Sequence, residues 1–517
     1  MAGKKQIQLN FLETASVGGN AFIGQWKEGP HECSRLKDQL EYYIWLAKIA
    51  EKGKITSIFF PDSYGVNDVY GGNTDATYRG GCQVAQLDPV VLIPAMAAVT
   101  KSVGFAVSAN ACYLNPYIMA RTFSTLDHVT NGRIGWNIVT GYTNASAKAM
   151  GFDQIMAHDK RYEKAEEFVD LTYKLWEGSW DDDAQVWDVE NDVAYEPSRI
   201  HRIDFEGQFH RLSATQQTHP SRQRVPVLFQ AGSSKAGIAL AGAHAEGLYC
   251  GSMVPSHTAK YVENIRASAA AAGRDPRSVK AFAGISLFLG RTTEEAQAEY
   301  DAAAKNVSPI AGLAKFGGYT NVDMSKYPLD EPFEFTANPG SADNVIQGII
   351  TNFKAGDGST ETWTPRKLGS KIALGGLYPI FIGTAEQVAD SMEDWVAKTD
   401  IDGFNLYYCS NPETYEDVVE MLVPELQRRG VYWMDYPVPG GTFRENMYFG
   451  ETSPRLPDDH PAGKIRLARE AKRQLNDGAG EPKEKAASKL TNGLKNGLTN
   501  GHQHHAAERV LFTAKPV

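Results

Sequence analysis

The sequence VGFAVSANACYLNPYIMARTFSTLDHVTNGRIGWNIVTG, residues 103–141, contains the unit from which the fold is built. It begins with an apolar run at 103–110, continues with an amphipathic segment at 116–132 and ends with a second apolar run at 133–141. Short apolar runs predict buried strands, and the segment between them predicts a helix. The stretch therefore predicts a strand, a crossover helix and a second, parallel strand.

The same alternation continues on both sides of this unit. Further strands are predicted at 7–13, 57–62, 225–232, 247–251, 279–290 and 403–408, and further helices at 35–53, 87–101, 160–178, 234–245, 384–399 and 414–430. The total comes close to eight parallel strands. This favours a closed (β/α)8 TIM barrel of the α/β class over an open, doubly wound sheet.

Two long insertions interrupt the alternation. Around 179–224, the acidic SWDDDAQVWD and the segment RIDFEGQFHRL, with Gly207 at a turn, predict an inserted antiparallel hairpin. Residues 305–370 are rich in Gly, Pro, Asp and Thr, so we expect an irregular insertion that is a candidate lid over the barrel. The barrel domain with these insertions is expected to span 1–453.

The remaining residues, 454–517, are expected to form a largely disordered C-terminal extension. Their composition is polar, repetitive and almost free of aromatic residues, so they cannot bury a core of their own. The HQHH cluster in this segment could bind a metal ion, but a solvated tail is the favoured interpretation.

Charge and cysteine content exclude several classes of protein. A net charge of -10 and a sequence pI near 5.7 argue against a nucleic-acid surface, which needs clustered Lys and Arg. The five cysteines are scattered and form no CxxC, so neither a disulfide framework nor a zinc knuckle is indicated. Without a signal peptide or a membrane-spanning run, we expect a cytoplasmic protein that does not contact membranes.

Polar residues follow several of the predicted strands at the point where each strand ends. In a TIM barrel these ends meet at one face, which carries the functional residues. Any single one could simply cap the next helix, but five aligned ends favour a site. Asn137 is the most unusual, because its amide interrupts an apolar strand and needs a polar partner. The residues concerned are Glu13, Asp62, Ser108, Asn110, Asn137, Thr140, Ser233 and Ser234.

The stretch QAGSSKAG, residues 230–237, predicts an anion site. A small turn leading into a helix offers backbone N–H groups, hydroxyls and the positive end of the helix dipole. The alternative is that Ser233 or Ser234 only caps the helix. His158 and Tyr162, four residues apart on a predicted helix, lie on one face and could reach the same anion.

Two further observations bear on chemistry. Aromatic residues near the strand ends suggest a partly apolar pocket, although core packing would also explain them; they are Trp26, Phe59, Tyr64 and Tyr113. The chain contains no HExxH, GxSxG, P-loop or early GxGxxG motif, which argues against metal, serine or nucleotide hydrolysis and against the dinucleotide-binding fold.

Several long motifs, in one order across roughly residues 5–450, resemble those of a known family. They are FFPD, LDPVVLIPAMAAVT, NPYIMARTFSTLDHVTNGRIGWNIVTG, HDKRYEKAEEF, PVLFQAGSSKAG and LVPELQRRG. The chain resembles the bacterial-luciferase-like flavin monooxygenases, in the branch with the nitrilotriacetate, dibenzothiophene-sulfone, dimethylsulfide and long-chain alkane enzymes. The resemblance implies a TIM barrel with insertions that binds FMN at the strand ends and no metal.

The resemblance also assigns residues to the cofactor. The positions that match the family's flavin contacts are Asp62, Ser108, Asn137, His158, Tyr162, Ser233 and Ser234. Tyr162, Ser233 and Ser234 would hold the phosphate, and Asn137 would face the flavin. At Ser108 the chain has SAN where the family usually has two adjacent hydroxyl residues.

The implied activity is that of a two-component monooxygenase. A separate NAD(P)H:flavin reductase would deliver reduced FMN (FMNH2), which reacts with O2 to give a C4a-hydroperoxyflavin and transfers one oxygen atom to a small organic substrate, with sulfur- and nitrogen-containing compounds among the candidates. A homodimer or homotetramer is expected. The alternatives are a deazaflavin (F420)-dependent oxidoreductase of the same fold and a non-catalytic flavin-binding protein. The family oxidises varied substrates on one scaffold, so the fold does not identify the substrate.

Overall fold

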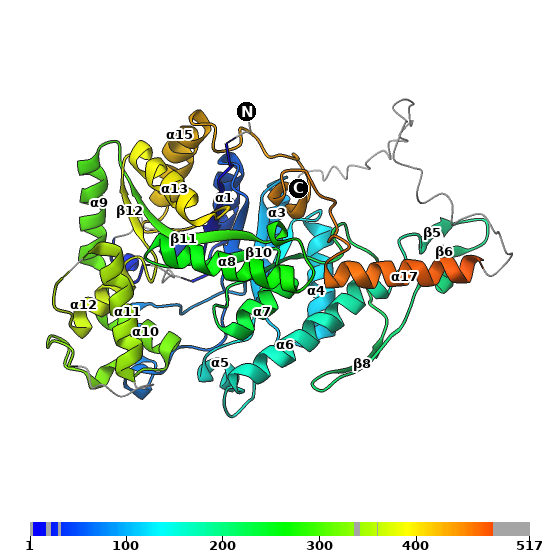
Figure 1. The fold of residues 1–517 in the computed structure, drawn as a ribbon, viewed down its shortest axis with the longest axis horizontal. Helices are drawn as coiled ribbons and strands as arrows, with labels where there is room; N and C mark the ends of the chain where they lie inside the picture. Colours follow the sequence, from blue (N-terminus) through cyan, green and yellow to red (C-terminus); the bar gives the residue numbers. More distant parts are fainter. Residues whose placement is uncertain (1–3, 17–21, 29–32, 335–341, 359, 479–517) are drawn as a thin grey trace, which may run out of the picture. The chain divides into compact units, whose positions relative to one another are not determined.

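Eight parallel strands close into a barrel in the computed structural model, which describes residues 4–478 except 17–21, 29–32, 335–341 and 359 (Figure 1). The strands are β1 (Gln8–Leu12), β2 (Ser57–Phe60), β3 (Gly104–Asn110), β4 (Ile134–Val139), β9 (Val227–Gln230), β10 (Gly247–Cys250), β11 (Lys280–Leu289) and β13 (Gly403–Tyr407). They pair in chain order, and β13 pairs with β1 to close the ring. The TIM barrel and each of its predicted strands are confirmed.

The strands read as continuous apolar runs because both of their faces are buried. On β3, Phe105 and Val107 pack in the core between the barrel and the helices, whereas Ala106 between them belongs to the core inside the barrel. Side chains alternate across a strand, so each strand supplies both cores. This explains why the strands carry no alternation of polar and apolar residues.

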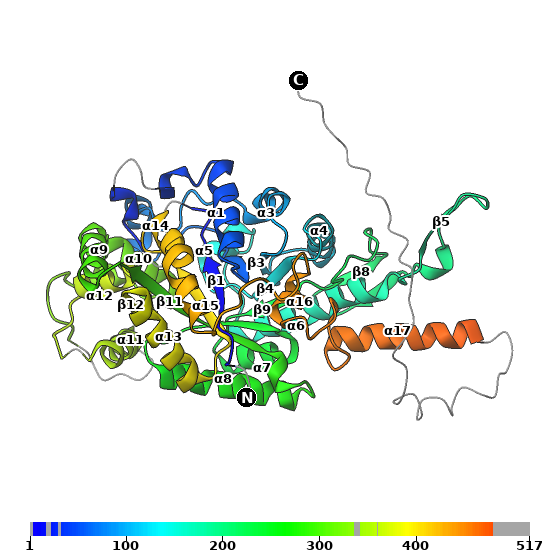
Figure 2. The same cartoon turned by 90° about the horizontal axis from the view of Figure 1, so that it is seen from above.

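Helices surround the barrel, and Figure 2 shows α1, α3 and α4 following one another along one side of it. Asn115 begins α4 by accepting hydrogen bonds from the N–H groups of Tyr117 and Ile118, with Pro116 in the first helical position. None of the helices that the structure describes is long and apolar enough to span a membrane. The main surrounding helices are α1 (Leu40–Lys52), α3 (Pro89–Ala98), α4 (Pro116–Val129), α6 (His158–Tyr173), α7 (Lys235–His244), α8 (Pro255–Ala271), α13 (Ala385–Thr399) and α15 (Val423–Arg428).

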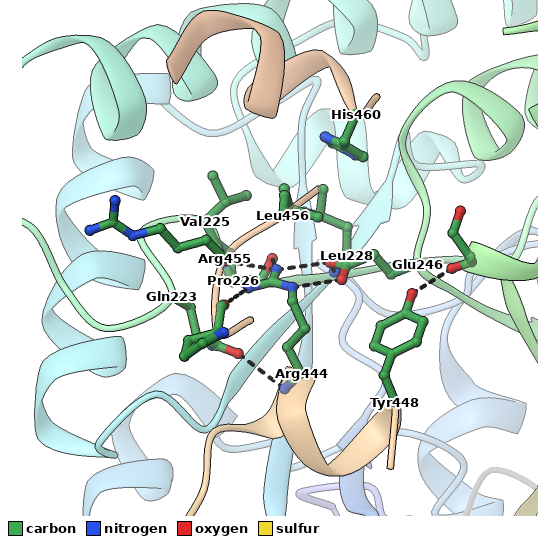
Figure 3. A network of polar contacts seen from close by, with 12 residues as sticks. Gln223, Val225, Pro226, Leu228, Glu246, Arg444, Tyr448, Arg455, Leu456 and His460 are labelled. Carbon is green, nitrogen blue, oxygen red and sulfur yellow. Dashed lines mark hydrogen bonds and ion pairs between the residues drawn. The ribbon is translucent and has the colours of Figure 1, made fainter. Parts of the chain in front are cut away.

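The short helix α16 (Phe443–Met447) closes the N-terminal end of the barrel. Phe443 packs in the inner core, and a Cβ on Gly104 would come within 2.6 Å of its ring. The neighbouring Arg444 is fully buried; its Nε donates to Glu246 Oε1 at 2.7 Å and its Nη2 to the carbonyl of Val225 at 3.0 Å (Figure 3). Phe443 and Met447 thus fill the N-terminal end of the barrel interior.

The insertion predicted at 305–370 is not irregular. It forms α10 (Pro309–Thr320), α11 (Ala342–Asp357) and α12 (Pro365–Ala373), which share an apolar cluster of their own. Two of its glycines serve helix packing: a Cβ on Gly312 of α10 would lie 2.0 Å from the carbonyl oxygen of Gly369 on α12. The prediction of irregular structure from the glycine-rich composition was therefore wrong, since these glycines permit two helices to approach closely. The strand β12 (Ile380–Gly383), which was not predicted, follows and pairs with the far end of β11.

The other insertion, at 179–224, contains two hairpins instead of the single one predicted. β5 (Gln185–Asp188) pairs with β6 (Val193–Tyr195), and β7 (Ile203–Glu206) pairs with β8 (Arg211–Ala214). Gly207 lies in the turn between β7 and β8, as expected. The Glu167 carboxylate of α6 fixes this turn by accepting from the N–H groups of Phe209 at 2.8 Å and Gln208 at 2.6 Å.

The barrel unit extends further along the chain than the predicted boundary at 453. It comprises Met1–Leu467, and Leu456, His460 and Ala462 are buried in it. His460 Nε2 lies 2.9 Å from the carbonyl oxygen of His244. The overall polar composition of 454–517 gave no indication that these few residues would be buried. The helix α17 (Pro461–Gly478) begins in this unit, and the expectation of disorder together with the HQHH cluster falls on 479–517, outside the described residues.

Candidate functional site

A cavity of about 1030 Å³ lies at the C-terminal ends of the barrel strands. Its lining residues come from the loops after β2, β4, β9 and β10, and from the first turns of α6 and α8. The structure brings all seven predicted site residues to this one cavity: Asp62, Ser108, Asn137, His158, Tyr162, Ser233 and Ser234. Asn110 and Thr140, which also end predicted strands, line it too.

Asn137 has a partner for one of its two polar atoms. It lies opposite Ser108 in the register of β4 and β3, and its Nδ2 donates to Ser108 Oγ at 2.8 Å. Its Oδ1 is buried and has no hydrogen-bond partner among the described residues. Leaving such an acceptor unpaired costs about 1–3 kcal/mol. This part of the cavity wall therefore suits a bound molecule that presents an N–H or O–H group.

The turn from β9 into α7 forms another part of the wall. Ser234 caps α7, because its Oγ accepts from the N–H of Gly237 at 3.1 Å, so the alternative role as a helix cap applies to this residue. The hydroxyl of Tyr162 lies against the same turn, where a Cβ on Gly232 would come within 2.9 Å of it. With Ser233 beside it, the turn presents hydroxyls and the N-terminus of a helix to the cavity, which is an arrangement that binds anions.

Arg161 adds a positive charge to this end of the cavity and was not predicted from the sequence. It lines the cavity next to Tyr162, and only 9% of it is exposed. Its buried Nε has no hydrogen-bond partner in the described part of the chain. Burying a cation is costly unless an anion accompanies it. The spacing of His158, Arg161 and Tyr162 on one helical face could have indicated it.

His158 lies at the edge of the same region. Its side chain is 48% exposed, its Nδ1 lies 2.7 Å from Asp159 Oδ1, and its ring centroid is 5.0 Å from that of Tyr162. It is therefore the more solvent-accessible of the groups around the β9–α7 turn.

Asp62 is the acidic group of the cavity. Burial, together with the nearby Asp88 carboxylate, raises the pKa of Asp62 from the usual 3.8 to about 7. The Nε2 of Gln86 donates to its Oδ1 at 2.5 Å and offsets part of this cost. Near neutral pH this carboxyl can therefore hold or release a proton.

Glu13, Trp26 and Tyr113 do not line the cavity, although the sequence placed them near the strand ends. The Glu13 carboxylate is fully buried behind β1, where Lys37 Nζ donates to its Oε1 at 2.5 Å and the hydroxyl of Tyr42 donates to its Oε2. Glu13 therefore pairs with a lysine 24 residues further along the chain and does not line the cavity with the other residues at the strand ends. The other two predicted aromatic residues, Phe59 and Tyr64, do line the cavity.

The helical insertion contributes to the outer part of the cavity. Tyr319 of α10 and Asn352 of α11 line it, together with Leu377 and Tyr378 of the loop before β12. The ring of Tyr319 lies 5.9 Å from that of Tyr142, which follows β4. The insertion thus forms part of the wall around the mouth, and its closing as a lid remains a prediction.

The chain is similar in sequence to known proteins over most of its length. The family model described as luciferase-like monooxygenase matches residues 20–402. The long-chain alkane monooxygenase of Geobacillus thermodenitrificans is 38% identical over 89% of this chain and 98% of its own length. The dimethyl-sulfide monooxygenase of Hyphomicrobium sulfonivorans is 36% identical over 92% and 96%. Nitrilotriacetate monooxygenase component A of Aminobacter aminovorans is 31% identical over 86% and 97%.

Solved structures agree with the sequence relationship. A crystal structure of a long-chain alkane monooxygenase superposes with a TM-score of 0.80 at 38% identity and covers 90% of this chain and 100% of the other. A riboflavin lyase solved with modified FMN and riboflavin gives a TM-score of 0.79 at 32% identity, covering 89% and 100%. The resemblance drawn from the sequence motifs is confirmed.

Proposed function

Because this chain belongs to the luciferase-like monooxygenase family, we propose that it is a flavin-dependent monooxygenase that uses reduced FMN and O2 to place one oxygen atom on a small organic substrate. The observation that carries this proposal is the combination, in one cavity, of an anion site and an orphaned hydrogen-bond acceptor. A riboflavin phosphate presents the complementary groups at its two ends.

The phosphate fits the end of the cavity formed by the β9–α7 turn. The Tyr162 hydroxyl, Ser233 and the N-terminus of α7 would donate to it, and the Arg161 guanidinium would neutralise its charge. Hydrogen bonds between charged partners are the strong ones, and a helix N-terminus favours an anion. This is one phosphate cradle, so we expect FMN to bind in preference to FAD or NADH.

The flavin ring fits the end of the cavity that holds Asn137. The buried Oδ1 of Asn137 would accept from a ring N–H, and Ser108 keeps the amide oriented through its 2.8 Å hydrogen bond. Asp62, with its pKa raised to about 7 by burial and Asp88, would hold a proton close to the ring. When bound, the reduced flavin supplies the activation of O2, which the side chains alone cannot provide.

The remaining contribution of the chain is to exclude water and hold the substrate. A volume of about 1030 Å³ is at the upper end of what a single small ligand occupies, which is consistent with cofactor and substrate sharing one cavity. Tyr319 and Asn352 place the insertion over its outer part. A closed mouth would slow the access of water to the reacting groups.

A separate reductase is the proposed partner. The chain carries no GxGxxG after its first strand, so a site for the nicotinamide cofactor is not indicated in its sequence. The relative from Aminobacter aminovorans is named as component A, which is in keeping with a system of more than one protein. A homodimer or homotetramer also remains a prediction.

The test is an anaerobic titration of the full chain with reduced FMN, FAD, NADH and reduced F420, followed by O2 consumption with chemically reduced FMN. We expect tightest binding for FMN and O2 uptake that yields oxygenated product in a mass-spectrometric substrate screen. Preference for F420 would instead support a hydride-transferring oxidoreductase. FMN binding without product formation from any substrate would support a non-catalytic flavin protein.

A further inference from the structure

The basic side chains of the cavity lie on the helices next to the β9–α7 turn. Among its described lining residues, Asp62 and Arg161 are the only Asp, Glu, Lys or Arg side chains, and the histidines are His158 and His257. Arg161 and His158 lie on the first turns of α6, and His257 lies on the first turn of α8. The same two helices contact the β9–α7 turn, since the Tyr261 hydroxyl of α8 donates to the carbonyl of Gly232 at 2.9 Å. Arg161 and the two imidazoles therefore lie on the two helices that contact the turn proposed to hold the phosphate.

The outer chamber, defined by Tyr142, Tyr319, Asn352, Leu377 and Tyr378, has no Asp, Glu, Lys, Arg or His among these residues and is mostly aromatic. Tyr378 stacks on Tyr407 with ring centroids 4.4 Å apart, and Tyr142 faces Tyr319 at 5.9 Å. The accessible fraction of Tyr142 is 52%, and its side chain contributes to the lining of the cavity.

Lys315 of α10 is a buried cation next to one of these rings. It is 2% exposed, and its Nζ lies 5.5 Å from the ring centroid of Tyr319. It is not among the described residues that line the cavity, so it does not present its charge to the chamber surface.

We infer that the outer chamber selects uncharged substrates and rejects substrates that carry carboxylates. This inference rests on the proposed function, because it assigns Arg161 and its neighbours to the FMN phosphate. A carboxylate in the chamber would exchange water for aromatic surface without a counter-charge, and Asp62, the one Asp, Glu, Lys, Arg or His among the described lining residues outside the phosphate end, is itself acidic. Aromatic and aliphatic surface, in contrast, is matched by the tyrosine rings and Leu377.

A matched pair of probes isolates charge from size. Methyl 4-(methylsulfanyl)benzoate is neutral, whereas 4-(methylsulfanyl)benzoate has nearly the same shape and carries one negative charge at pH 8. Calorimetric titration of the full chain, loaded with FMN or flavin-free in inorganic phosphate that occupies the anion site, gives the affinity ratio of ester to carboxylate in the chamber. We expect the ester to bind at least about tenfold more tightly, because an unpaired buried charge costs at least as much as a lost charged hydrogen bond.

Variants locate this selectivity in the chamber. Tyr142→Arg places a cation in its wall and should shift the ratio by about tenfold or more toward the carboxylate. Tyr142→Phe should keep the parent ratio. Tyr78→Arg, on the 57%-exposed Tyr78 of α2 (Asp75–Gly80), adds the same charge outside the cavity and should also keep it.

Two results would overturn the inference: a carboxylate that binds the parent as tightly as the ester, or a ratio that Tyr142→Arg leaves unchanged. Failure of the proposed function is read separately, as loss of FMN binding in the same calorimeter. The ratio in the flavin-free protein remains measurable in that event.

Discussion

At the scale of single residues, the site is defined by polar atoms whose partners are missing. Asn137 Oδ1 and Arg161 Nε are both buried and lack hydrogen-bond partners within the described chain, and both belong to residues that line the cavity. Each such atom costs free energy of folding unless a ligand pairs with it. Other buried atoms without partners lie elsewhere in the described chain, Gln8 Oε1 among them, so the distinguishing feature is that these two belong to one cavity.

Asn137→Val should weaken FMN binding without weakening the fold. The substitution removes an unpaired buried acceptor, so the stability of the flavin-free protein should be unchanged or higher. The affinity for reduced FMN should fall by about 1–3 kcal/mol, the cost of a lost buried hydrogen bond. Anaerobic fluorescence titration measures it, and Tyr162→Phe is the companion variant. Parental affinity in both variants would show that the site has been located wrongly.

Arg161→Gln separates phosphate recognition from ring recognition. The variant keeps a polar side chain but loses the charge, so the FMN affinity should fall at least about tenfold, as expected for a hydrogen bond to a charged group. Riboflavin, which lacks the phosphate, should bind to variant and parent equally. Arg211→Gln, at a side chain that is 82% exposed on β8, is the matched control. An equal loss for both flavins would contradict the assignment of Arg161 to the phosphate.

Asp62→Asn should stabilise the flavin-free protein increasingly as pH rises above about 4, with the full gain above pH 7. The raised pKa of about 7 means that the folded protein retains this proton where the unfolded chain has lost it, so stability declines as pH rises from about 4 to 7 and the full cost persists above 7. Removing the ionisable group should recover up to about 2–4 kcal/mol at pH 8, from about 1.4 kcal/mol per pKa unit, and nothing at pH 4. Urea unfolding at the two pH values checks this. A gain of equal size at both would rule out titration as the cause.

At the scale of elements, the barrel strands contribute to stability at their N-terminal ends and to the candidate site at their C-terminal ends. The N-terminal ends of the strands rest on α16, whose Phe443 fills the space left by Gly104 and Gly135 at the starts of β3 and β4. The C-terminal ends open into the cavity. The division is typical of TIM barrels and allows the loops to vary without loss of the fold.

Arg444→Met should destabilise the protein by about 3–5 kcal/mol, because it leaves Glu246 buried without its ion-pair partner. The double variant Arg444→Met with Glu246→Met should recover much of this loss, since no unpaired charge remains. Glu420→Gln breaks the exposed pair with Lys52 and should change stability by less than about 1 kcal/mol. The midpoints of urea unfolding measure all three. A double variant as unstable as the single one would indicate that packing, not charge pairing, sets the cost.

At the scale of the whole molecule, the barrel unit depends on residues near its C-terminal boundary. Leu456, His460 and Ala462 are buried within the unit Met1–Leu467, and the Arg444 guanidinium donates to the carbonyl of Pro454. The segment after the last barrel strand is therefore part of the folded unit, although its composition alone does not indicate this.

Two truncations test this boundary. A chain that ends at Ser453 should melt several degrees below the parent, because it loses the buried Leu456 side chain, worth about 1.5–3 kcal/mol, and the contact of His460 with His244. A chain that ends at Gly478 should melt with the parent, since the composition of 479–517 cannot bury a core. Differential scanning calorimetry distinguishes the two. Equal melting temperatures for the parent and both truncated chains would show that the folded unit ends at 453.

The order and type of the barrel elements, and most of the candidate site, were readable from the amino-acid sequence. Strands buried on both faces are continuous apolar runs, and helices such as α4 carry their own start signals in Asn115 and Pro116. Once a parallel barrel is inferred, its topology alone brings the strand ends to one face. This is why Asp62, Ser108, Asn137, Ser233 and Ser234 could be expected at one face, whereas His158 and Tyr162 were added from their spacing on one helix and the family resemblance assigned all seven to the flavin; all of them line one cavity.

Other features were decided only by contacts between residues far apart in the chain. Lys37 draws Glu13 away from the cavity, and the lack of a partner for the buried Arg161 Nε appears only once the surrounding chain is in place. The glycine content of 305–370 predicted turns, but in the structure Gly312 and Gly369 allow two helices to pack closely. A sequence pattern indicates the local conformational preference of a segment and the period of its apolar residues. The burial of a polar side chain and the identity of its partner depend on residues that only the tertiary fold brings next to it. For this reason the fold followed from local signals, while the charge distribution inside the cavity required the packed barrel.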